Sequence, residues 1–120
     1  MSREMLNFVL QQLGVGAAGI EAAAVISTDG LILVSQLAEG LDADRVGAIG
    51  AAMYSLAGKM SGALDCGELD QLFLQGKSGC ILLCRAGSHS LLCVCASATA
   101  RLEPVFQEAQ RAAVAIGKIL

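Results

Sequence analysis

The sequence predicts an α+β fold, in which residues 1–120 form one domain with a five-stranded antiparallel sheet and helices on its faces, in the order α-β-β-α-β-β-β-α. Three observations support this fold class. The chain has 120 residues, enough for one hydrophobic core. An Asp-Gly pair separates two apolar runs near the start, as is typical of a β-hairpin. Later segments alternate between helical and short apolar patterns.

The N-terminal part predicts a helix followed by a hairpin. Residues 2–13 carry apolar side chains on one helical face, with Ser2 as a candidate N-cap and Gly14 just after the end. Residues 20–27 and 31–36 then form two strands around the turn Thr28-Asp29-Gly30. The strand at 20–27 depends mainly on Val25 and Ile26, because its three alanines favour strands only weakly.

A long helix is predicted over residues 43–64, with Asp42 as its N-cap. Its four glycines each cost about 0.5–1 kcal/mol relative to alanine, so other contacts must offset them. Residues 68–75, 80–85 and 91–96 follow as a three-stranded meander. The chain ends in a helix whose first turn contains Pro104 and whose apolar residues form one narrow stripe: Leu102, Val105, Phe106, Ala109, Ala113, Ile116 and Leu120.

The long middle helix has two unlike faces. One is a wide apolar stripe that we expect to lie on the sheet: Val46, Ile49, Met53, Leu56, Met60 and Leu64. The roughly opposite face is small, apart from the only tyrosine: Gly47, Gly50, Ala51, Tyr54, Gly58 and Gly62. Because glycine allows another backbone to approach closely, we expect this second face to contact the same helix of a second copy in a two-fold homodimer. The alternative is that the glycines pack against the chain's own terminal helix.

The strand at residues 68–75 can lie at the edge of the sheet, where it can pair with its symmetry mate and make one continuous sheet. The two middle helices would then lie side by side over the seam. This assigns a further set of residues to the dimer interface: Glu68, Leu69, Asp70, Gln71, Leu72, Phe73 and Leu74. A solvated, charged edge is the alternative, supported by Glu68 and Asp70.

Composition favours a protein partner. The residue types AVILMFWYC make up 55% of the chain with 14 glycines in addition, whereas an average domain reaches about 45–50% with glycine included. No apolar run approaches the roughly 18 residues of a membrane span, so no membrane insertion is expected. The eight scattered Lys and Arg and the net charge of −3 argue against nucleic acid. No export signal is recognisable at the start, and a cytoplasmic location is expected.

The five cysteines are Cys66, Cys80, Cys84, Cys93 and Cys95, and we expect reduced thiols. If residues 86–90 form a five-residue loop, Cys84 faces Leu92 across the hairpin. Cys80 and Cys84 then share one sheet face and Cys93 and Cys95 the other, which disfavours one tetrahedral zinc site. A one-residue bulge would reverse this arrangement, so a redox or metal enzyme stays as a third hypothesis.

Two further features have plain structural explanations. Gly76-Lys77-Ser78 resembles the end of a phosphate-binding loop, but Gln71 stands where that motif requires glycine. His89, the only histidine, lies between two serines in a predicted loop and is expected to be exposed. We therefore predict no catalytic residue and no cofactor.

Three segments together resemble the Roadblock/dynein light-chain domain family, in particular its bacterial members. They are residues 19–31, residues 41–48 and residues 67–72, in which a strand-Asp-Gly-strand unit is followed by a helix of small residues. The resemblance covers nearly the whole chain and implies a longin- or profilin-like fold. It also implies dimerisation through the middle helix and the following strand, at the positions Gly47, Ala51, Tyr54, Gly58 and residues 68–74.

The resemblance implies a non-enzymatic homodimer that binds a small Ras-like GTPase in polarity, motility or signalling, with stimulation of GTP hydrolysis as one effect it can have. Bacterial members of the family act on the GTPase without supplying an arginine finger, so Arg45 and Arg85 need not be catalytic. The alternative is a structural adaptor that tethers a motor or signalling complex and does not act on a GTPase. The five cysteines depart from the family pattern.

Overall fold

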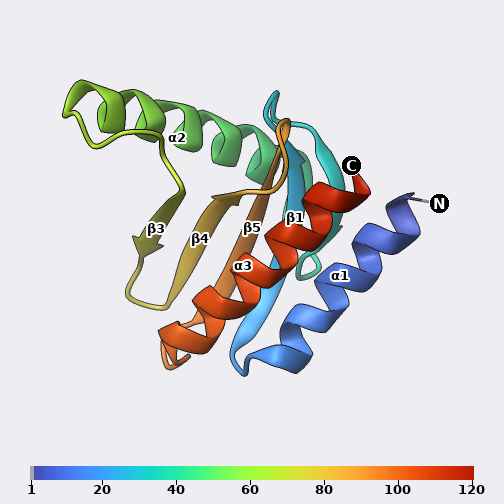
Figure 1. Cartoon of the computed structure of the whole chain (residues 1–120). Coiled ribbons are helices and arrows are strands. Elements are labelled where there is room, and N and C mark those ends of the chain that lie inside the picture. Colours follow the sequence, from blue (N-terminus) through green and yellow to red (C-terminus); the bar gives the residue numbers. More distant parts are fainter. Residues whose placement is uncertain (1) are drawn as a thin grey trace.

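The helices and strands follow the predicted order in the computed structural model, which describes residues 2–120 (Figure 1). The bounds are α1 Ser2–Gly16, β1 Ile20–Ser27, β2 Ile32–Gln36, α2 Ala43–Ala63, β3 Gln71–Gln75, β4 Gly79–Arg85, β5 Ser90–Ser97 and α3 Leu102–Ile119. The α+β fold class predicted from the sequence is confirmed.

Local signals in the sequence account for the hairpin and for the start of α2. Gly30 has a φ of +92°, a conformation that glycine adopts without strain, and it closes the turn between β1 and β2. Asp42 caps α2, because its side chain accepts a hydrogen bond from the backbone N–H of Arg45 at 3.2 Å. Both predictions are confirmed.

Three predicted boundaries are wrong by a few residues. Ser2 is already helical, and α1 continues through Gly14 to Gly16. β3 begins at Gln71 rather than at residue 68, because the preceding residues contact side chains of α2 and β4 instead of pairing with β4.

The five strands form one antiparallel sheet in the order β2-β1-β5-β4-β3, so β2 and β3 are the edge strands. β4 and β5 are direct neighbours, with Cys84 opposite Leu92, as predicted. The hairpin formed by β1 and β2 therefore lies at one end of the sheet and β3 at the other.

Helices cover the two faces of the sheet unequally. α1 and α3 lie side by side over one face, and their buried residues form the larger core with that face of β1, β4 and β5 (Figure 1). Phe73 of β3 belongs to this side, where its ring meets that of Phe106 at 5.4 Å in an edge-to-face arrangement. α2 alone lies on the opposite face. Within residues 2–120, none of the helices combines the length and the apolar character that crossing a membrane requires.

Candidate functional site

The face of α2 that contacts the sheet is its glycine face. A β-carbon on Gly47 would lie 2.8 Å from the carbonyl oxygen of Gly30, and one on Gly50 would lie 3.2 Å from Cδ1 of Ile26. Ala51 and Tyr54 are buried on the same side. The expectation that this face contacts a second copy is therefore wrong for Gly47, Gly50, Ala51 and Tyr54. The small residues among them let the first half of the helix lie close to the chain's own sheet.

The apolar stripe of α2 is correspondingly turned away from the sheet. Ile49, Leu56, Met60 and Leu64 have exposed fractions of 48%, 65%, 66% and 69%. The prediction that this stripe lies on the sheet is therefore wrong. Met53, in the same stripe, is partly buried against the smaller core together with Leu72 and Ile81. Met53 is therefore the member of the stripe that packs on the smaller core.

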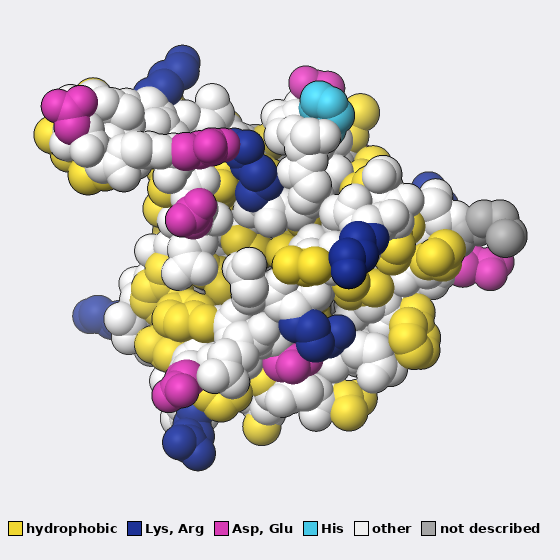
Figure 2. All heavy atoms as spheres, in the orientation of Figure 1, with side chains coloured by type: hydrophobic (Ala, Val, Ile, Leu, Met, Phe, Trp, Pro, Cys, Tyr) yellow, Lys and Arg dark blue, Asp and Glu magenta, His cyan; other side chains and the backbone are white. Residues whose placement is uncertain are grey.

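The second half of α2 extends beyond the sheet. Gly58 and Gly62 continue the line of Gly47 and Gly50 along the helix, but no atom of residues 2–120 would lie within 4 Å of a β-carbon on either. Figures 1 and 2 show this half of α2 as an arm that projects past β3, with hydrophobic side chains on its surface. The glycine face is therefore covered along the first half of the helix and open along the second.

β3 has a free backbone edge next to this arm, because it pairs only with β4. Its side chains alternate between the two faces of the sheet. Phe73 contacts α3, whereas Leu72 and Leu74 lie on the α2 side. Leu74 is 40% exposed, so both the edge and one face of β3 are open.

α2 leaves part of its own sheet face uncovered. Leu83 and Cys93 are direct neighbours across β4 and β5, and both are buried near α2. The next row of neighbours on the same face is Leu74, Ile81 and Cys95, in which exposure is higher. The open row, the arm and the edge of β3 together form a continuous unpartnered surface.

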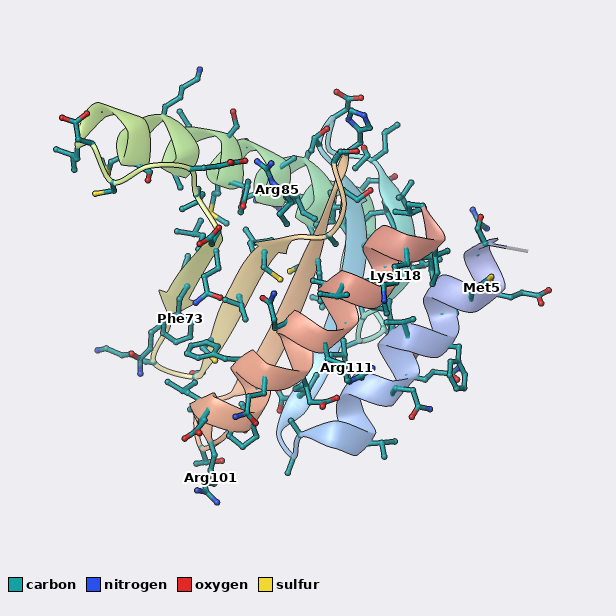
Figure 3. The ribbon with its side chains drawn as sticks, viewed as in Figure 1. Met5, Phe73, Arg85, Arg101, Arg111 and Lys118 are labelled. Atoms are coloured by element: carbon teal, nitrogen blue, oxygen red, sulfur yellow. The ribbon has the colours of Figure 1, made fainter. Side chains whose placement is uncertain are left out.

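A set of short contacts holds the segment that connects α2 to β3. The hydroxyl of Tyr54 donates to the carbonyl oxygen of Leu69 at 2.8 Å, and Nη1 of Arg85 lies 2.6 Å from Oε1 of Glu68. Figure 3 shows Arg85 between the end of β4 and α2. Burial raises the pKa of Tyr54 above its ordinary value, while the neighbouring guanidinium of Arg85 acts in the opposite direction. These contacts join α2, β4 and the start of β3.

The cysteines lie on two sheet faces, as predicted. Cys80 and Cys84 belong to the core beneath α1 and α3, and Cys93 lies on the α2 side. Burial raises the pKa of Cys84 to about 11 and that of Cys93 to about 12, which keeps both as neutral thiols near pH 7. Among residues 2–120, no three His, Cys, Asp or Glu side chains are grouped so as to hold a metal ion.

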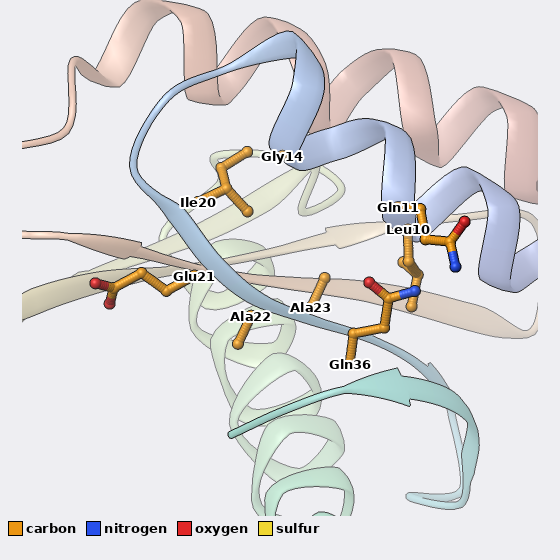
Figure 4. Close-up of a pocket in the computed structure, with 8 residues that line it drawn as sticks. All are labelled: Leu10, Gln11, Gly14, Ile20, Glu21, Ala22, Ala23 and Gln36. Atoms are coloured by element: carbon orange, nitrogen blue, oxygen red, sulfur yellow. The ribbon is translucent and has the colours of Figure 1, made fainter. Parts of the chain in front are cut away.

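The remaining candidates are a hairpin turn and hollows at the surface. The backbone N–H of Gly76 donates to the carbonyl oxygen of Gly79 at 2.8 Å, which closes a hairpin turn, and a strand rather than a helix follows. The hollow between α1 and the start of β1, lined in part by Gly14, Ala22 and Gln36, has a volume of about 100 Å³ (Figure 4). Pockets for small-molecule ligands are usually about 300 Å³ or larger, so this hollow is too small for one. Three other hollows reach about 330–390 Å³ but are open to solvent, and residues 2–120 group no metal-binding set of side chains. The α2 and β3 surface is the stronger candidate.

Comparison with known proteins identifies the family. The Roadblock/LC7 domain matches residues 7–96 of the chain. The chain belongs to the Roadblock/LC7 domain family. One relative is an uncharacterized protein of Methanocaldococcus jannaschii, 33% identical over 88 residues, which cover 73% of this chain and 76% of the relative.

Solved structures show the same Roadblock fold. Gliding protein MglB of Thermus thermophilus is similar with a TM-score of 0.87 and 21% identity, covering 99% of this chain and 90% of that protein. MglB of Myxococcus xanthus is similar with a TM-score of 0.89 and 18% identity, covering 98% of this chain and 88% of that protein. At these identities the likeness concerns the fold.

Sequence reasoning placed the candidate site on α2 and β3, but it assigned the wrong face of α2 to the sheet. It missed the exposure of Leu56, Met60 and Leu64, and it missed the ion pair of Arg85 with Glu68. The sequence did carry a signal for the exposure of Leu56, Met60 and Leu64. Its surplus of apolar residues is too large for a single chain of this size to bury, so an apolar face must stay exposed. We find no sequence signal for the pairing of Arg85 with Glu68.

Proposed function

We propose that this Roadblock domain is a homodimeric regulator or adaptor that binds a small Ras-like GTPase through protein–protein contacts. The observation that carries the dimer is the projection of α2 beyond β3, beside a free strand edge. The GTPase partner rests on the resemblance to Roadblock domains, which commonly regulate or tether small GTPases.

One two-fold axis could place a second chain against the edge of β3, the projecting half of α2 and the open row at the same time. If the axis passes through the edge of β3 and is perpendicular to the sheet, the two copies of β3 pair as antiparallel strands. The same rotation brings the projecting half of α2 over the second chain's sheet at the end that its own α2 leaves open. Gly58 and Gly62 would then lie over the row of Leu74, Ile81 and Cys95 in the partner.

The two α2 helices would become neighbours in this arrangement. Leu56, Met60 and Leu64 lie on the flank of α2 that Met53 turns toward the open row, and the second α2 would occupy that space. Apolar burial contributes about 25 cal/mol per Å², so covering this stripe favours association. Of the residues that the sequence assigned to the interface, the proposed dimer keeps Gly58, Gly62 and the edge of β3. The other four residues of the helix contact the chain's own sheet: Gly47, Gly50, Ala51 and Tyr54.

The dimer is tested with two matched substitutions. Met60 and Val15 are both strongly exposed, on opposite layers of the molecule. Size-exclusion chromatography with light scattering should find a dimer for the wild type and for Val15→Asp, and a monomer for Met60→Asp. Gly58→Leu should also give a monomer. A wild-type monomer at all concentrations would contradict the dimer.

The GTPase is tested by adding the Ras-like GTPase encoded nearest in the genome, loaded with GDP or with a GTP analogue. We expect a complex with the GTP-analogue form and no complex with the GDP form, and hydrolysis assays then show whether the dimer stimulates GTP hydrolysis. A dimer that binds neither form would favour the adaptor without action on a GTPase.

A further inference from the structure

We propose that Tyr54, Arg85 and Glu68 form a latch within each chain that holds the α2–β3 connection and the edge of β3 in the position that a second chain requires. This inference rests on the proposed dimer and assigns positioning residues to its interface. The three residues come from three elements: Tyr54 from α2, Arg85 from the end of β4 and Glu68 from the connection.

The part of the connection next to β3 has few other contacts. Residues 62–68 are exposed, and β3 is a five-residue strand that pairs with β4 on one side. The half nearest α2 is held by three hydrogen bonds: Ser61 Oγ donates to the carbonyl oxygen of Gly67 at 2.7 Å, and the backbone N–H groups of Asp65 and Cys66 donate to the carbonyl oxygens of Gly62 and Ser61. Nearer β3, Leu69 is partly buried against the smaller core. Exposed connections with few apolar contacts open locally at low free-energy cost.

The latch acts at the point where the connection turns into β3. Tyr54 is buried against the sheet, so the position of its hydroxyl is set by packing, and its 2.8 Å hydrogen bond fixes the carbonyl of Leu69 two residues before β3. Arg85 ends β4, the only neighbour of β3, and its 2.6 Å ion pair fixes Glu68 one residue earlier. Two adjacent residues are thus tied to two different rigid elements.

The consequence for assembly is preorganisation. If the β3 edge of a chain is ordered only part of the time, the association constant is multiplied by the fraction of chains in which it is ordered. In a two-fold dimer this fraction enters twice, once for each chain. Since Arg85 and Glu68 are about half and about three-quarters exposed, their ion pair contributes little to the stability of the folded chain itself. Its loss acts once on the folding of a single chain but in both chains of the dimer, so it should weaken dimerisation more than folding.

The test measures the dimer dissociation constant by sedimentation equilibrium alongside the unfolding midpoint. Arg85→Glu should weaken the dimer roughly tenfold with a small change in unfolding, and the swap Arg85→Glu with Glu68→Arg should recover most of the affinity. Arg111→Glu is the control, since it removes the ion pair between Arg111, which is exposed to a similar extent as Arg85, and the partly buried Glu108 on α3, and changes the net charge equally. Tyr54→Phe should also weaken the dimer.

A second readout shows whether the latch forms before assembly. Tyr54 is the only tyrosine and the chain has no tryptophan, so tyrosinate absorbance reports this one site. In the monomeric Met60→Asp background, Arg85→Met should raise the pKa of Tyr54 further, because the guanidinium opposes the effect of burial. No change would show that Arg85 does not lie beside Tyr54 in the single chain, and would overturn the proposal that the latch forms before assembly.

The outcomes separate this inference from the proposed dimer. A dimeric wild type whose dissociation constant is unaffected by Arg85→Glu, or affected equally by Arg111→Glu, overturns the latch and leaves the dimer intact. A wild type that is monomeric overturns both. Recovery of affinity in the charge swap, together with the shift at Tyr54 in the monomer, supports the latch.

Discussion

Gly47 lies so close to Gly30 that a β-carbon at position 47 would be 2.8 Å from the carbonyl oxygen of residue 30. This contact joins the first half of α2 to the turn between β1 and β2. It is a contact with backbone, which cannot rotate away as a side chain can. The glycine face of α2 is thus a packing surface within the chain along its first half.

The pair Gly47→Ala and Gly58→Ala tests this arrangement. Both add one methyl group and the same gain in helix propensity, about 1 kcal/mol. Gly58→Ala meets no atom of the described residues within 4 Å and should stabilise the chain by about that amount, whereas Gly47→Ala should destabilise it by about 1–2 kcal/mol through the clash. Urea unfolding in the monomeric Met60→Asp background measures the difference. Equal effects would show that α2 does not contact the hairpin turn in this way.

The sequence predicts the elements of this fold better than it predicts the packing between them. Local chemistry determines the Asp29-Gly30 turn and the Asp42 cap, and strand alternation determines the opposite facing of Cys84 and Cys93. Each of these depends on residues that are near in the chain or directly paired.

The orientation of α2 depends on a different kind of information. A helix with one apolar face and one small-residue face can place either on a sheet, and the outcome depends on the space that the sheet and a second chain leave. Leu56 and Met60 have the character of core residues but are exposed in a single chain. Periodicity identifies such a stripe without identifying what covers it.

The cap at Asp42 provides a prediction about the start of α2. Asp42→Ala removes the acceptor for the N–H of Arg45 and should lower the free energy of unfolding by about 1 kcal/mol. Asp44→Ala, inside the first turn and outside the capping position, is the control and should have a smaller effect. Urea unfolding at neutral pH compares them, and equal losses would assign the effect to charge near the helix terminus instead of to the cap.

Alkylation should distinguish the cysteines by their positions. Cys66 is exposed, whereas Cys84 and Cys93 are buried and have pKa values raised to about 11 and about 12. Near pH 8, iodoacetamide should label Cys66 first, and Cys84 and Cys93 only when the chain unfolds. Peptide mass spectrometry over time checks the order, with Cys66→Ser as the control that removes the fast reaction. Rapid labelling of Cys93 in the folded protein would contradict the burial of this strand beneath α2.

The same two thiols should make the free energy of unfolding decrease as the pH rises into the alkaline range. Their ordinary pKa is 9.0, and burial raises the pKa to about 11 for Cys84 and about 12 for Cys93 in the folded chain. Above pH 9 the unfolded chain loses these protons while the folded chain keeps them, so unfolding releases protons and becomes easier as pH rises. Each thiol should lower the free energy of unfolding by about 1.4 kcal/mol per pH unit, until pH reaches its folded pKa.

Urea unfolding between about pH 8 and about pH 10.5, a window of roughly two and a half units across the ordinary thiol pKa, measures this dependence. The double substitution Cys84→Ala and Cys93→Ala creates small cavities and should lower stability at pH 8, but it should flatten the decline at higher pH. Cys66→Ala is the control, because this exposed residue should leave the slope unchanged. Tyr54 adds a decline in the same direction above its ordinary pKa of 10.0, since burial raises the pKa of this group too. A double variant with the wild-type slope would mean that the two thiols titrate alike in the folded and unfolded chains, and hence that they are not shielded from solvent by the sheet and its helices.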